Sequence, residues 1–117
     1  MDIQYSPEVR QSPDGLTLLE QASTLLAEVL GPQSSQKVKA EWDRVHDHKG
    51  RTLYRLTLRD FTGSVSTDFT SADLQNPMHL KYRLYRLWGD LLQIRNDLQH
   101  QKVLLLMGQV ATESEGN

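Results

Sequence analysis

The chain of 117 residues contains no cysteine. This absence excludes disulfides, thiolate nucleophiles and cysteine-based zinc sites. It also fits a reducing compartment, so we expect a cytoplasmic protein. Long hydrophobic runs are missing as well: the longest, at residues 103–107, is far too short to cross a membrane. Residues 1–10 have no apolar stretch typical of a secretory signal, so we expect neither export nor membrane insertion.

An excess of positive charge is also missing. The formal net charge is −2, whereas nucleic-acid-binding proteins are typically basic. The charge is unevenly distributed, because residues 1–35 carry one basic and five acidic side chains and residues 77–112 carry five basic and two acidic ones. The region from residue 77 onward is therefore the part best suited to contact an anion.

The motifs of common enzyme classes are absent too. We find no glycine-rich phosphate loop, no nucleophile elbow and no His-Glu-x-x-His pattern. The single cluster that resembles a metal site is His46, Asp47 and His48, with Asp43 nearby. It falls at the predicted tip of a hairpin, where ligands lack supporting second-shell contacts, so we interpret it as a solvated turn. We expect a protein without enzymatic activity, metal or cofactor.

Two helices are predicted. The first begins after Ser12, a capping hydroxyl followed by Pro13, and ends at Gly31. The second begins near Pro77 and runs to about Met107, with Gly89 as a weak interruption. Its apolar residues follow heptad spacing, which places them on one narrow face. They are Leu80, Leu84, Leu87, Leu91, Ile94 and Leu98.

Between the helices, three segments alternate apolar and polar residues with the period of a half-buried strand. A hairpin loop at residues 48–50, with Gly50 in the left-handed position, and a type I turn at residues 60–63 fix how the strands pair. Because this register keeps every apolar side chain on one face, the pattern supports it. The predicted pairs are Trp42 with Leu56, Ala40 with Leu58, Leu58 with Val65, Leu56 with Thr67, and Tyr54 with Phe69.

These elements predict an α+β fold with the order α-β-β-β-α. We expect a two-layer sandwich, in which a three-stranded antiparallel meander carries both helices on one face. The expected boundaries are a flexible arm at residues 1–11, a single domain at residues 12–111 and a disordered tail at residues 112–117. The alternative for residues 1–11 is a short edge strand.

The long helix carries more apolar surface than one sheet requires. A helix of about 30 residues is about 45 Å long and extends beyond a domain of this size. Leftover apolar surface typically marks a partner interface, so we predict a non-enzymatic protein–protein interaction module that forms a homodimer through this helix. The alternative is that the helix breaks at Gly89 and both halves fold onto one core. The residues expected to mediate self-association are Trp88, Leu91, Leu92, Leu98 and Leu105.

An alternative function is nucleic-acid binding by the same helix, in which basic and aromatic residues are interleaved. The order α-β-β-β-α resembles that of double-stranded RNA-binding domains and of small dimeric nucleoid-associated proteins, a likeness of fold alone that assigns no residue a role. The candidate contacts to nucleic acid are Lys81, Arg83, Arg86, Arg95 and Lys102.

The outer face of the predicted sheet is polar. The register places Arg55 between Asp43 and Asp68, so opposite charges face each other across the strands. We interpret this face as a solvated, ion-paired surface. The alternative is a recognition surface for a protein partner, with Lys39 and Arg59 as contacts to an anion.

Overall fold

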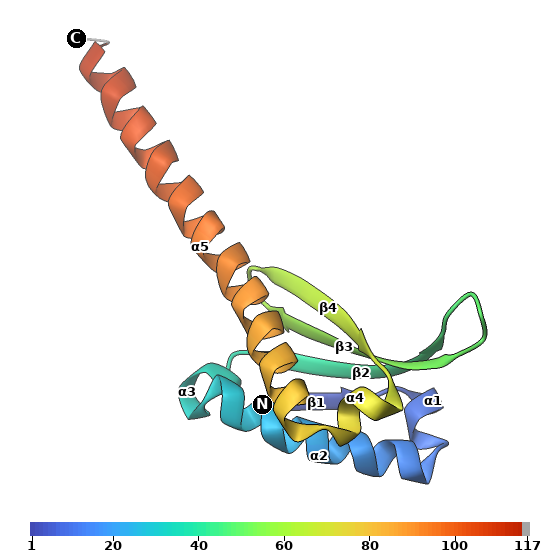
Figure 1. Ribbon diagram of the computed structural model, residues 1–117. Helices are drawn as coiled ribbons and strands as arrows, with labels where there is room; N and C mark the ends of the chain where they lie inside the picture. Colours follow the sequence, from blue (N-terminus) through green and yellow to red (C-terminus); the bar gives the residue numbers. More distant parts are fainter. Residues whose placement is uncertain (116–117) are drawn as a thin grey trace.

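The computed structural model describes the backbone of residues 1–115 and the side chains of residues 1–108. The fold is α+β (Figure 1). Its strands are β1 (Asp2–Tyr5), β2 (Lys39–His46), β3 (Thr52–Asp60) and β4 (Gly63–Phe69). Its helices are α1 (Pro7–Arg10), α2 (Pro13–Leu30), α3 (Pro32–Ser35), α4 (Ser71–Gln75) and α5 (Pro77–Glu115).

The sheet has four strands in the order β1-β2-β3-β4 and is mixed, so the predicted three-stranded antiparallel meander is incomplete. Strand β1 pairs in parallel with β2, which aligns Ile3 with Ala40 and Tyr5 with Trp42. Residues 2–5 therefore form an edge strand, the alternative to the flexible arm that was favoured for this segment. This strand is too short to show a clear alternating pattern, and its partner lies far along the chain.

The predicted register of the other three strands is confirmed. Trp42 pairs with Leu56, and Tyr54 pairs with Phe69. Both turn predictions hold as well: Gly50 has a φ of 78°, and Asp60 pairs with Gly63 across the second turn. Packing of the apolar face and turn geometry thus specify the same pairing.

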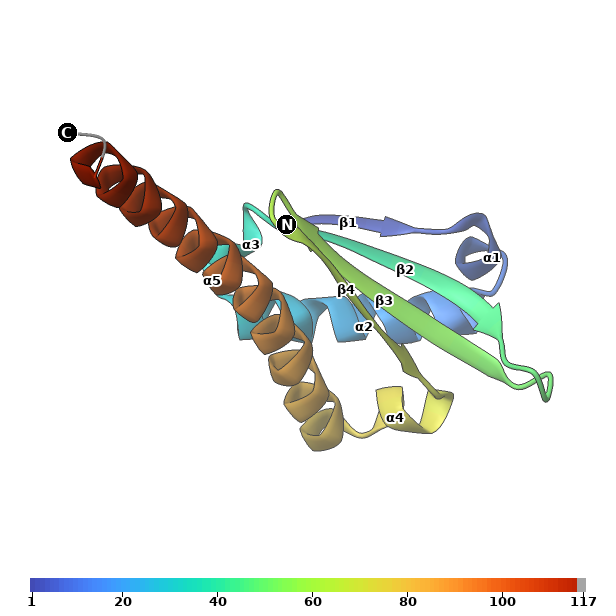
Figure 2. The same ribbon diagram turned by 90° about the horizontal axis from the view of Figure 1, so that it is seen from above.

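Helix α2 and the first part of α5 pack on the same face of the sheet (Figure 2). The predicted ends of α2 are confirmed, because Ser12 accepts a hydrogen bond from the Gly15 amide and Gly31 ends the helix with a φ of 80°. The fully buried large side chains come from the sheet and from both helices: Trp42, Phe69, Leu19, Leu26, Leu56, Leu58, Leu84 and Leu91.

Helix α5 is continuous through Gly89, so the alternative of a broken helix is wrong. It continues to Glu115, into the segment expected to be a tail, whereas residues 116–117 lie outside the described part. Figure 1 shows its C-terminal part projecting from the body of the protein. The dimensions of the molecule, 68 × 34 × 24 Å, reflect this projection.

A buried hydroxyl links the sheet to α2. Ser23 accepts hydrogen bonds from the Trp42 indole N–H at 2.9 Å and from the Tyr5 hydroxyl at 3.2 Å. Replacement Ser23→Ala leaves the buried indole N–H without a partner, so we expect the free energy of unfolding to fall by about 2 kcal/mol. Urea denaturation measures this change.

The matched control is Thr24→Ala, which removes an exposed hydroxyl bound to the carbonyl of Glu20 in the same helix. Its effect should stay within about 0.5 kcal/mol of zero. Equal losses for the two variants would contradict a specific role for Ser23.

Candidate functional site

Helix α5 has an inner part that packs on the protein and an outer part that does not. The inner part buries Leu80, Leu84, Leu87 and Leu91 in the core. All side chains of residues 101–108 are exposed. Within the part of the chain that the structure describes, no helix combines the length and apolar character needed to cross a membrane.

The outer part carries a run of exposed apolar side chains, which we call the α5 tip (residues 103–107). Between 52% and 68% of the surface of each of these residues is exposed. Because successive helical residues are about 100° apart, the five residues point in all directions around the helix. A helix that is apolar on all sides is normally buried. The α5 tip is therefore the strongest candidate interaction surface among the described residues.

The residues predicted to mediate self-association divide between the two parts of α5. Trp88 and Leu91 are buried in the core of the protomer, so their assignment to a dimer interface is corrected: the protein's own sheet and helices already cover them. Leu92 packs partly against this core, and Leu98 is half-buried. Leu105 is exposed within the α5 tip.

An ion pair holds α5 near the point where it leaves the body. The Arg95 guanidinium donates to the Asp60 carboxylate at 2.7 Å, and the Asp60 side chain is fully buried. Burial alone would raise the pKa of Asp60, but hydrogen bonds from Thr62 and Arg95 outweigh this effect and keep the pKa below its ordinary value. The same guanidinium lies over the Trp88 ring.

A second arginine connects α5 to the other end of β4. Arg83 donates to the Thr67 hydroxyl at 2.7 Å and to the Asp68 carbonyl at 2.8 Å. It also bonds to Asp73 at 3.3 Å and lies 4.3 Å from the centre of the Phe69 ring. Arg83 is thus fixed on several sides by the protein itself.

These contacts divide the residues proposed to bind nucleic acid. Arg83 and Arg95 are engaged in ion pairs within the protomer. Lys81, Arg86 and Lys102 are exposed. The basic surface of α5 is therefore smaller than the sequence indicates, which weakens the nucleic-acid hypothesis.

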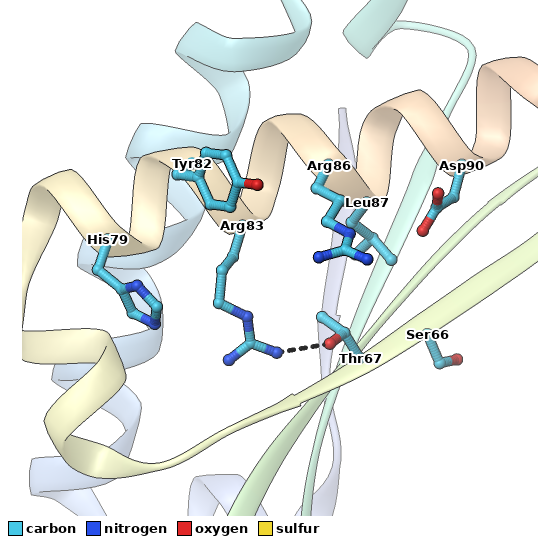
Figure 3. A pocket seen from close by; sticks show the side chains of 8 residues that line it. All are labelled: Ser66, Thr67, His79, Tyr82, Arg83, Arg86, Leu87 and Asp90. Carbon is cyan, nitrogen blue, oxygen red and sulfur yellow. Dashed lines mark hydrogen bonds between the residues drawn. The ribbon is translucent and has the colours of Figure 1, made fainter.

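Between β4 and α5 lies a groove of about 540 Å³, the β4 groove (Figure 3). Sequence reasoning missed it, because the groove forms only when residues of a strand and a helix meet. The one signal in the sequence is the four-residue spacing of Arg86 and Asp90, which places both on one face of the helix. The lining residues are Ser66, Thr67, His79, Tyr82, Arg83, Arg86, Leu87 and Asp90.

The remaining sequence candidates are engaged in local contacts. On the outer sheet face Arg55 bonds to Asp68 at 2.8 Å, which agrees with an ion-paired surface. In the hairpin loop, backbone and side-chain hydrogen bonds from Arg51 lower the pKa of Asp47. Among the described residues, no group of three or more His, Asp or Glu side chains is placed to hold a metal ion.

The sequence matches no family model, and neither the curated proteins nor the solved structures include a match to this chain.

The Asp60–Arg95 pair makes a testable contribution to stability. The pKa of Asp60 is lower in the folded protein than in the unfolded chain, so the contribution is complete above about pH 4 and is lost as the pH falls further. Replacement Asp60→Asn should lower the free energy of unfolding by about 2 kcal/mol at pH 7. Urea denaturation should show this difference shrinking between about pH 4 and pH 2.

The control Asp90→Asn alters an exposed carboxylate without a partner among the described residues. It should leave the stability at pH 7 within about 0.5 kcal/mol of wild type. The role of this ion pair is refuted if the difference in free energy of unfolding between the wild type and Asp60→Asn does not change with pH.

Proposed function

We propose that the protein is a non-enzymatic protein–protein interaction module that forms a homodimer through the outer part of α5. The observation that carries this proposal is the α5 tip, five consecutive apolar residues exposed on a projecting helix. Burying a leucine side chain contributes about 2 kcal/mol, so leaving such a segment in water is costly.

A second copy of the chain is a suitable occupant for this surface. Dimers with twofold symmetry use the same patch on both subunits, so a self-complementary apolar segment meets an identical one. From Arg95 to Glu115 the helix extends over about 30 Å, which leaves room for two helices to pair without contact between the bodies.

Charge also favours pairing of identical helices at this place. Residues 98–107 include one charged side chain, Lys102, among glutamine, histidine and apolar residues. Two copies therefore meet with little repulsion between like charges. Leu98 and Leu105 are one heptad apart, so both can face the partner helix.

Replacement Leu105→Asp tests the proposal. Its side chain is 68% exposed in the protomer, so the substitution should leave the fold intact while it places a charge in the interface. We expect light scattering to give twice 13.4 kDa for the wild type and 13.4 kDa for the variant. The dimer dissociation constant should rise at least about 30-fold.

The matched control is Asn96→Asp, which introduces the same charge at an exposed polar position on the side of the helix opposite to Leu98 and Leu105. It should remain dimeric, and circular dichroism should show unchanged helix content in both variants. The interface is ruled out if light scattering shows that the wild type is still a monomer at 100 times the protein concentration of a typical assay. It is also ruled out if the Leu105→Asp variant is a dimer.

A further inference from the structure

Strand β4 lies at the edge of the sheet and exposes part of its backbone. Asp60 and Gly63 flank a two-residue turn and form a hydrogen-bonded pair. In an antiparallel ladder every second pair is hydrogen-bonded, so on β4 the residues that bond to the backbone of β3 are those at positions 63, 65, 67 and 69. Ser64 and Ser66 occupy the other pairs, which directs their N–H and C=O groups away from β3. The Asp68 carbonyl, one position further in the same series, accepts its bond from Arg83 on α5 and confirms this direction.

Arg83 protects one end of this edge. Within the described residues, no comparable side chain bonds to the outward backbone groups of Ser64 and Ser66. Proteins usually block such edges, because unpaired groups recruit another strand. The segment 64–66 is therefore able to pair with an incoming strand.

The β4 groove lies beside this edge. Strand β4 and helix α5 run antiparallel, since Gly63 packs against Ile94 at one end and Thr67 bonds to Arg83 at the other. Figure 2 shows α4 between the end of β4 and the start of α5. A strand added to the edge of β4 would therefore lie beside α5, and every second side chain of that strand would point towards the helix.

Two opposite charges in the groove have no partner among the side chains that the structure describes. Arg86 and Asp90 are exposed, and neither forms an ion pair or side-chain hydrogen bond within the described residues. Figure 3 shows Arg86 extending from the helix towards the strand. Arg86 and Asp90 are four residues apart, which corresponds to about 6 Å along the helix axis. This separation is close to the distance of about 6.7 Å between alternate residues of a strand.

We propose that the β4 groove binds an extended peptide segment of a partner protein, which adds to β4 as a further strand. The peptide carries an acidic side chain opposite Arg86 and a basic side chain at the second position along, opposite Asp90. Its backbone pairs with Ser64 and Ser66. Tyr82 supplies an exposed ring at the wall of the groove. A free anion fits less well, because Asp90 repels it.

Two fluorescein-labelled peptides of identical composition test this proposal: Thr-Val-Glu-Val-Lys-Val-Thr and Thr-Val-Lys-Val-Glu-Val-Thr. One order of charges suits a parallel strand and the other an antiparallel strand, so both directions are covered. Fluorescence polarisation with the full chain should show one peptide binding about tenfold more tightly than the other. The double variant Arg86→Glu/Asp90→Lys should reverse this preference.

The pairing of the backbone is tested at Ser66. Replacement Ser66→Pro removes the outward N–H without removing a bond to β3 and should abolish peptide binding. Its control, Ser66→Ala, keeps the N–H and should bind as wild type does. Circular dichroism checks that both variants remain folded.

The proposal fails if neither peptide binds at about 1 mM, if the charge reversal leaves the preference unchanged, or if a folded Ser66→Pro still binds. The proposal also fails if the wild type binds no peptide and Ser66→Pro changes the molar mass of the protein. That result would show that the β4 edge pairs with a second copy of the chain. Leu105→Asp should bind the peptide as wild type does, so failure of the proposed dimer is distinguishable from failure of this inference.

Discussion

The ion pair between Asp60 and Arg95 determines how α5 leaves the body of the protein. Asp60 ends β3 directly before the turn into β4, and its buried carboxylate holds Arg95 at the last part of α5 that packs on the sheet. Arg83 holds the helix about three turns earlier, at the far end of β4. Two arginines thus align α5 along one strand, and the direction of the outer part follows from this alignment.

The same alignment separates two surfaces with different chemistry. Along β4 the helix lies beside an open backbone edge and forms a groove with polar and charged walls. Beyond Leu98 it has no strand to cover, and its residues become exposed. The apolar character of residues 103–107 is therefore not needed to stabilise the protomer, which is the main reason to connect it with association.

Local patterns predicted much of the fold. The register of β2, β3 and β4 followed from alternation and from two turns, because a shift by one residue would expose Trp42 and Leu56 together. The predictions failed where partners lie far apart in sequence. Nothing near Ile3 indicates that it pairs in parallel with Ala40.

The site was harder to predict for the same reason. The heptad pattern identifies a face of α5, but it does not tell which part of that face the protomer covers. Trp88 and Leu91 are in the core, whereas Leu105 on the same helix is exposed. Likewise, Arg83 and Arg86 look equivalent in the sequence, yet Arg83 is bound on several sides, whereas Arg86 has no partner in the part of the chain that the structure describes.

A dimer formed through the outer part of α5 would also change how the β4 groove works. Each protomer carries one groove on the inner part of the helix, so pairing the outer parts holds two grooves in one assembly. A partner with two suitable segments would then bind the second one at a high effective concentration, without any new contact. Weak pairing at the short edge 64–66 is thus compatible with firm attachment of a partner that presents its segment in two copies.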